Sequence, residues 1–243
     1  MKISILTLFP DFFQSLYQYS IIGRALENKI LELDCINIRD FSKNKHKKVD
    51  DYSFGGGPGM VMQPEPIYDA IHAVKTIDSK VYYLSPQGKV LTQEKLFELS
   101  KEDHIILLNG HYEGIDERII DHCVDEEISI GDYVLTGGEI PTMVLIDGIT
   151  RLLPGAISRE ESFLQESHMS SFLDHPHYTR PRVFKGWEVP EVLLSGNHKA
   201  IEQFRRLKSI ENTLLKRPDL LDEQCLSESE VKIVREFKEK EKS

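Results

Sequence analysis

Hydrophobic residues in the first 155 positions alternate between short continuous runs and helical spacing. The continuous runs are typical of strands buried on both faces of a sheet, and they cover residues 3–8, 33–38, 81–84 and 105–108. Helical spacing falls between and after them, over residues 12–28, 64–74, 92–99, 116–123 and 139–152. This alternation predicts an α/β domain with a mostly parallel sheet.

The pattern changes after Pro154-Gly155. Residues 156–173 are rich in Ser and Glu, which indicates a linker or loop. A helix then runs from about Ile201 to Pro218, and the Ser227/Glu230 spacing is a capping box for a last helix. We therefore predict three parts: an α/β domain over residues 1–157, an interdomain linker over 158–173 and a small all-helical domain over 174–243.

Composition narrows the protein class. No run approaches the roughly 20 apolar residues of a membrane span. Cys35, Cys123 and Cys225 are odd in number, widely spaced and without a C-x-x-C pair, which argues against a disulfide framework or a zinc cluster and favours the reducing cytoplasm.

The net charge of −10 opposes nucleic-acid binding, but the charge is unevenly distributed. Residues 174–217 hold nine basic and five acidic side chains, and a second basic cluster spans residues 43–48. Both surfaces could attract phosphate, although charge runs can also be simple solvated faces.

The glycine-rich segment Gly55-Gly-Gly-Pro-Gly59 follows the basic cluster. Its glycines allow positive φ and close approach to a ligand. No Gly-Lys-Ser/Thr follows, and the third glycine of a dinucleotide fingerprint is missing. The segment is therefore either a ligand-binding loop or a tight turn.

Residues 109–118 follow the strand at 105–108, where open α/β sheets bind ligands. Glu113 could accept hydrogen bonds from the N–H donors of a guanine edge. The alternative is a surface turn that begins a helix at Asp116 and Glu117.

Residues 130–139 carry glycines near both ends and open the helix 139–152. Their backbone groups could bind an uncharged planar ring. Arg151 lies near the far end of that helix, and a single arginine in the last turn of a helix is more often a partner of the helix dipole than a catalytic residue.

The segment His175-Pro-His177 has a metal-ligand spacing, but the sequence offers no evident third ligand, which favours a structural role.

Several of these segments recur together, in order, in one known family. They are Thr7–Pro10, Arg39–Phe41, His46–Asp51, Gly55–Met60, Leu84–Gly88, Gly110–Arg118, Ile130–Glu139, His177–Pro181 and Leu193–His198. In them the chain resembles, essentially end to end, the bacterial tRNA (guanine-N1)-methyltransferases of the SPOUT superfamily.

The resemblance implies a trefoil knot in the carboxyl half of the first domain, an exception to the un-knotted rule. It also implies a homodimer whose active sites are shared between subunits. The substrate would be guanosine 37 in tRNA, beside the anticodon, and the methyl donor S-adenosyl-L-methionine (AdoMet). Positions that match the AdoMet pocket are Leu84, Ser85, Gly110, Ile130, Gly131, Asp132, Tyr133, Val134, Leu135, Gly137, Gly138 and Pro141.

The same resemblance assigns roles in the chemistry. A general base must remove the proton of guanine N1, and charge that develops on O6 requires a cation or N–H donor, here Arg151. Magnesium has been invoked for the family, but this sequence does not indicate a metal. Residues expected to bind the tRNA are Tyr112, Glu113, Gly55, Gly56, Gly57, His177, Arg180, Ser195, His198 and Arg205.

One position departs from the family pattern. The usual base is an aspartate before a Ser-Phe pair in the linker, and here Glu161 precedes Ser162-Phe163. Asp and Glu have similar reference pKa values, so we expect Glu161 to be the base, with Glu160 as the alternative.

Three other functions compete with this interpretation. The Asp-to-Glu change would suit an RNA-binding module that has lost catalysis. A knotted methyltransferase acting on rRNA or another base is a second alternative. A nucleotide-binding regulator built on residues 55–59 is a third, which the missing lysine disfavours.

Overall fold

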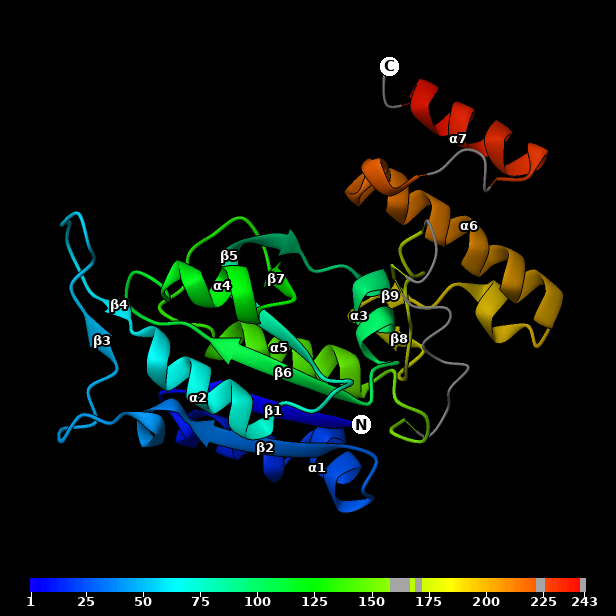
Figure 1. Ribbon diagram of the computed structural model, residues 1–243. Helices are drawn as coiled ribbons and strands as arrows, with labels where there is room; N and C mark the ends of the chain where they lie inside the picture. The colour runs from blue at the N-terminus through cyan, green and yellow to red at the C-terminus, as the bar shows by residue number, and fades with distance from the viewer. Residues whose placement is uncertain (158–166, 169–171, 222–225, 241–243) are drawn as a thin grey trace. The chain divides into compact units, whose positions relative to one another are not determined.

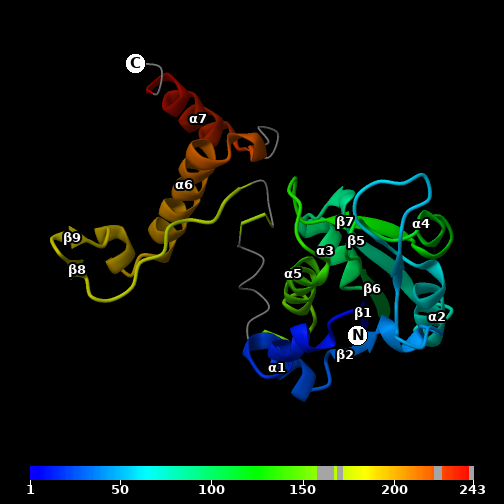
Figure 2. The same cartoon turned by 90° about the vertical axis from the view of Figure 1, so that its left-hand side faces the viewer.

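The computed structural model describes residues 1–157, 167–168, 172–221 and 226–240. The chain forms two compact units, Met1–Ser158 and Arg159–Ser243. Figures 1 and 2 show the elements of each unit from two directions.

A five-stranded parallel sheet forms the centre of the first unit (Figure 1). Its strands lie in the order β2-β1-β6-β5-β7. Their bounds are β1 (Lys2–Thr7), β2 (Glu32–Asn37), β5 (Lys80–Val90), β6 (His104–Asn109) and β7 (Glu126–Ser129). The four predicted runs correspond to β1, β2, β5 and β6, whereas β7 is too short and too acidic to form an apolar run.

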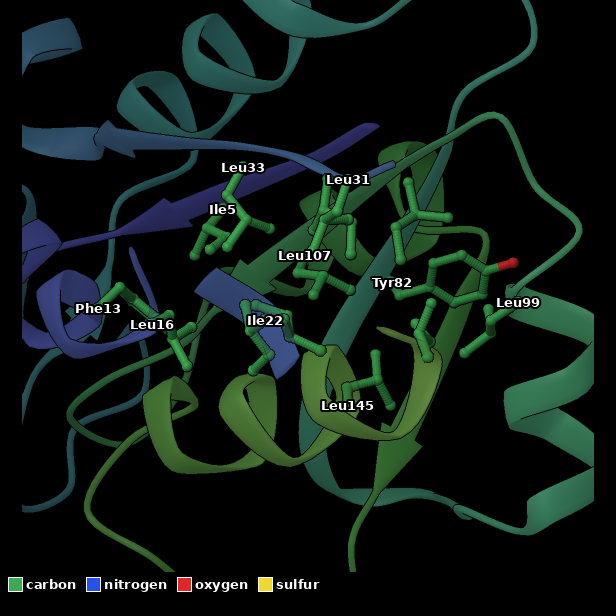
Figure 3. Close-up of a cluster of buried hydrophobic side chains, with 14 of the residues drawn as sticks. Ile5, Phe13, Leu16, Ile22, Leu31, Leu33, Tyr82, Leu99, Leu107 and Leu145 are labelled. Carbon is green, nitrogen blue, oxygen red and sulfur yellow. The ribbon is translucent and has the colours of Figure 1, made fainter. Parts of the chain in front are cut away.

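Helices cover both faces of this sheet, which explains why the central strand β6 carries the continuous apolar run Ile105–Leu108. On one face, η1 (Pro10–Tyr17), α1 (Ser20–Glu27), α3 (Gln93–Leu99) and α5 (Glu139–Thr150) pack on Ile3, Ile5 and Leu107 (Figure 3). On the other, η2 (Ile38–Phe41), α2 (Pro64–Val74) and α4 (Glu117–Cys123) pack on Leu6 and Leu108.

The helix expected over residues 12–28 is two elements. A 3₁₀ helix, η1, ends at Tyr17, and α1 begins at Ser20. Ser20 has a φ of 66°, a left-handed conformation that interrupts a continuous helical path. The helical spacing of apolar residues continues from η1 into α1 because both elements pack against the same core.

Strand β5 is the irregular element of the sheet. Leu84 and Lys89 both pair with Ile128 of β7, so the intervening residues bow out around the end of that strand. A Cβ at Gly88 would lie 2.5 Å from the backbone of Glu127 and Ile128, and only glycine permits this approach.

A small hairpin, β3 (Asp50–Asp51) and β4 (Val61–Met62), carries the glycine-rich loop. Val49 and Met62, both fully buried, anchor its two ends in the second core cluster.

The second unit consists mainly of two helices, α6 (His198–Lys216) and α7 (Glu228–Lys240). Shorter elements precede or connect them: the hairpin β8 (Val183–Phe184) and β9 (Trp187–Glu188), and the 3₁₀ turns η4 (Glu191–Leu194) and η5 (Pro218–Leu220). Its core is small and contains Phe172, Ile210, Leu214 and Val234.

The capping box expected at the last helix is present. The Ser227 amide donates to the Glu230 carboxylate at 2.8 Å, and the Glu230 amide donates to the Ser227 hydroxyl at 3.4 Å. The hydrogen bond from Arg206 is the main reason that the pKa of Glu230 falls to about 2, so this carboxylate links α7 to α6.

Candidate active site

Three loops at the carboxyl edge of the sheet line a cavity of about 300 Å³. The first, residues 84–87, is the bowed part of β5 itself, and the other two follow β6 and β7. Parallel strands bring their carboxyl ends to one edge, so segments distant in sequence converge there. Of the twelve positions expected to bind AdoMet, eleven line this cavity, and Asp132 is exposed outside the lining.

The substrate positions Tyr112 and Glu113 line the same cavity. Tyr112 has a φ of 61°, which is rare for an aromatic residue and concentrates at functional sites in proteins. The lining also contains residues that the sequence did not single out, including Gln87, His111 and Glu127. Gln87 and His111 lie inside motifs already recognised, whereas nothing in the sequence distinguished Glu127.

Close packing positions the Gly137-Gly138 turn. A Cβ at Gly138 would lie 2.9 Å from Cα of Asn109, and the Gly138 amide donates to the Gly110 carbonyl at 3.2 Å. The Asn109 side chain is itself held from two sides: its Nδ2 donates to the Leu6 carbonyl at 2.9 Å, and Thr142 Oγ1 donates to its Oδ1 at 2.7 Å. The glycines therefore allow the turn to lie directly on β6.

A buried polar network lies behind this turn. The Glu139 side chain is only 5% exposed. Thr7 Oγ1 donates to Glu139 Oε1 at 2.7 Å, and His111 Nε2 lies 2.8 Å from Oε2. A buried carboxylate is tolerated only when it is paired or hydrogen-bonded, and Glu139 has a partner for each oxygen. The network joins β1, the loop after β6 and the first turn of α5.

Tyr83 supports the loop after β6. A Cβ at Gly110 would lie 2.6 Å from the Tyr83 hydroxyl, so glycine is required where the loop crosses the ring. Burial, with smaller contributions from Glu127 and Glu117, raises the pKa of Tyr83 to about 12. The phenol therefore stays neutral at physiological pH.

The cavity is acidic. Glu113, Glu117 and Glu127 line it, and no Lys or Arg occurs among the described residues of the lining. Carboxylates favour a ligand that carries positive charge and disfavour phosphates. AdoMet has a sulfonium, an ammonium and a planar adenine, so these carboxylates and glycine-rich backbones fit that molecule.

The glycine-rich loop lies beside this cavity. The Glu113 amide donates to the Met60 carbonyl at 3.0 Å, and the Met62 amide donates to the Gly114 carbonyl at 3.0 Å. Gly59 contacts the Glu113 side chain so closely that a Cβ would overlap it. Residues 55–59 lead into β4 rather than into a helix, unlike phosphate-binding loops that open helices.

Arg151 lies elsewhere in the unit. It is the C-cap of α5, while Gly138 is the N-cap of the same helix. At 1.5 Å per residue, the two ends are about 20 Å apart. Within one chain, therefore, Arg151 is remote from the cavity at the carboxyl edge of the sheet, which we call the donor cavity. Glu161 and its alternative Glu160 lie outside the described residues.

In the second unit, His177, Arg180 and Arg205 line one cavity together with Arg182. His198 and Arg205 line an adjoining one. Ser195 shapes the turn before α6: its hydroxyl donates to the Val192 carbonyl at 2.7 Å and accepts from the Asn197 amide at 3.1 Å.

The structure also places a third potential ligand beside His175 and His177. Ligand atoms of Asp174, His175 and His177 lie within 4.8 Å of one another. Burial raises the pKa of Asp174, but hydrogen bonds from both histidines outweigh it and leave the pKa below its usual value. The three side chains thus satisfy one another by hydrogen bonding.

The sheet and the cavity together define the class of this protein. The chain has a parallel sheet with a loop-lined cavity at its carboxyl edge, and the family that its sequence matches has the SPOUT methyltransferase fold. The family model described as tRNA (Guanine-1)-methyltransferase TrmD matches residues 1–223, and the chain belongs to this family.

Curated relatives match along nearly the whole chain. A tRNA (guanine-N(1)-)-methyltransferase of Alkaliphilus metalliredigens is 56% identical over 99% of this chain and 99% of its own length. That of Ruminiclostridium cellulolyticum is 59% identical over 91% of this chain and 97% of its own. That of Clostridioides difficile is 57% identical over 90% and 97% respectively. No helix in the described part of the chain is both long and apolar enough to cross a membrane.

Proposed function

We propose that this protein transfers the methyl group of AdoMet to N1 of guanosine 37 in tRNA. The observation that carries the proposal is the acidic cavity of glycine-rich loops in a chain of the tRNA (Guanine-1)-methyltransferase family. When bound, AdoMet supplies an electrophilic methyl group on a positively charged sulfur. We expect the reaction in the cytoplasm, because tRNA is the substrate.

The chain's own residues hold the two reactants in position. The bowed part of β5 and the loop after β7 would enclose AdoMet, and Glu113 would accept hydrogen bonds from the guanine edge. The glycine-rich loop contacts Glu113 and therefore lies where the target nucleotide enters. Arg151 would stabilise negative charge on guanine O6 as the N1 proton leaves to the base.

We propose that the working form is a homodimer whose sites combine residues of both copies. Arg151 and the donor cavity lie at opposite ends of α5, so one chain does not bring them together. The outer face of α5 exposes Ile140 and Val144, at 47% and 45%, one turn apart. An apolar stripe on a helix favours association with a second copy.

The second unit would bind the anticodon arm through its basic cavities. His177, Arg180, Arg205 and His198 line these cavities, next to the turn that Ser195 shapes. Such contacts with phosphates lose affinity as salt rises.

Labelled AdoMet with tRNA transcripts that carry G or A at position 37 tests this function. We expect methyl transfer to the G37 transcript alone, since only guanine carries a protonated N1 next to O6. Transfer to both transcripts would indicate a different target base. RNA binding without any transfer would support an RNA-binding module instead.

The base is tested by replacing the glutamates of the linker one at a time. We propose that Glu161→Gln lowers kcat by at least about 100-fold, as expected for loss of a general base, with AdoMet affinity preserved. Glu160→Gln tests the alternative base, and Glu166→Gln is the matched control, because it removes one linker carboxylate. Near-full turnover in Glu161→Gln, or a larger loss in either other variant, would show that Glu161 is the wrong assignment.

A further inference from the structure

The loop between β3 and β4 exposes two aromatic side chains. Phe54 is 100% exposed and Tyr52 is 79% exposed. A ring without contacts adds nothing to the stability of the fold, since burial is the source of hydrophobic stabilisation. Exposure of both rings therefore indicates that they contact another molecule.

The backbone holds this loop in a defined conformation. The Gln63 amide donates to the Val49 carbonyl at 2.7 Å at its base, and the Ser53 hydroxyl donates to the Gly56 carbonyl at 3.0 Å. Gly55, Gly56, Gly57 and Gly59 have φ values of 86°, 80°, 124° and 82°. Glycine adopts these values readily, so they orient the neighbouring rings at little steric cost.

The loop ends against the candidate active site. The Met60 carbonyl accepts a hydrogen bond from Glu113, and Gly59 contacts the Glu113 side chain. Phe54 lies five residues before Gly59 in the same loop. A nucleotide next to one held by Glu113 would therefore be within reach of the loop.

Positive charge lies at the other end of the same hairpin. Lys43, Lys45, His46 and Lys47 are exposed, and Lys48 is half-buried. The ion pairs Lys43–Asp69 and Lys47–Asp40, at 3.4 and 3.9 Å, are exposed and therefore weak, so phosphates can replace the carboxylates. A surface that combines exposed aromatic rings with lysines has the chemistry that binds single-stranded nucleic acid.

We propose that Phe54, assisted by Tyr52, stacks on an unpaired base of the tRNA that flanks the target guanosine. The lysines at 43–48 bind the phosphates of the same strand. This inference rests on the proposed function, since it takes the target guanosine to lie at Glu113.

The test uses the full-length protein and an anticodon stem-loop with 2-aminopurine beside the target guanosine. Stacking on Phe54 quenches the probe, and the variant Phe54→Ala should abolish that quenching. We expect Phe54→Ala to raise KM for the stem-loop by about 10-fold, typical of one lost stacking contact, with AdoMet affinity unchanged. Phe54→Leu should match the alanine variant, and Phe54→Trp should restore quenching and KM.

Ile77→Ala is the matched control, because Ile77 is another fully exposed apolar residue of the first unit. Wild-type KM in Phe54→Ala, or full rescue by Phe54→Leu, would overturn the inference. Sedimentation gives a further check. If Phe54→Ala weakened the dimer and left RNA affinity unchanged, the ring would belong to an interface between copies, and the inference would be wrong. Quenching by a wild-type protein that transfers no methyl group would refute only the proposed function.

Discussion

At the residue scale, Glu139 is the charged group with the least exposure at the site. It bridges Thr7 and His111 behind the Gly137-Gly138 turn. The sequence marks Glu139 only as the residue that opens a helix after two glycines. Its partners come from 132 and 28 residues away, so the tertiary fold alone creates the network.

We expect Glu139→Ala to weaken AdoMet binding and to destabilise the fold. The change leaves Thr7 and His111 without their acceptor, which costs about 1–3 kcal/mol in the free energy of unfolding. Denaturant unfolding and calorimetric AdoMet titration measure the two effects. Asp121→Asn, an exposed carboxylate on α4, is the control. Unchanged AdoMet affinity in Glu139→Ala would show that the network does not position the turn.

At the scale of elements, the bend of β5 around β7 decides where the first cavity loop lies. Residues 85–88 connect two stretches of β5 that both pair with Ile128. The motif Leu84–Gly88 indicates an important loop but contains no signal for this double pairing. The four residues of β7 have no strand pattern of their own in the sequence, and only their pairing with β5 in the structure identifies them as a strand.

We expect Gly88→Ala to disturb this bend. The new methyl group would meet the backbone of Glu127 and Ile128, and backbone cannot rotate away as a side chain can. Overpacking of this kind costs about 1–3 kcal/mol, and the cavity should bind AdoMet more weakly. Gln87→Ala, the exposed neighbour, should change stability by less than about 0.5 kcal/mol. Equal thermal unfolding of the two variants would contradict the steric argument.

At the scale of the whole molecule, one chain does not bring Arg151 to its own donor cavity. Its distance from Gly138 along α5 is a consequence of helix geometry and holds for every copy. A second copy whose α5 runs in the opposite direction can supply the arginine. In the homodimer that we propose, activity would require association of the two copies.

Complementation tests this arrangement. Arg151→Ala and a cavity variant such as Gly138→Val should each be inactive alone. Mixed after dissociation, they should recover roughly a quarter of wild-type activity, because half of the dimers are mixed and each has one intact site. A mixture as inactive as its components would show that each site uses one chain.

The sequence by itself determined much of this protein. Continuous apolar runs such as residues 105–108 predicted strands covered on both faces, since a run of this kind is stable only where both faces of the strand are buried. Glycine motifs located the loops at 110–114 and 130–138, because these backbone shapes exclude side chains. Asp116 and Ser227 marked helix starts through local hydrogen bonds. All of these signals act over a few residues.

Only the tertiary structure decided how those pieces meet. It placed Glu113 against Gly59, His111 against Glu139 and Asp174 between two histidines. It also separated Arg151 from the cavity within one chain, although the resemblance assigns both to one active site. The physical reason is that burial and hydrogen bonding between distant residues depend on the packed chain, and no local pattern encodes their distances.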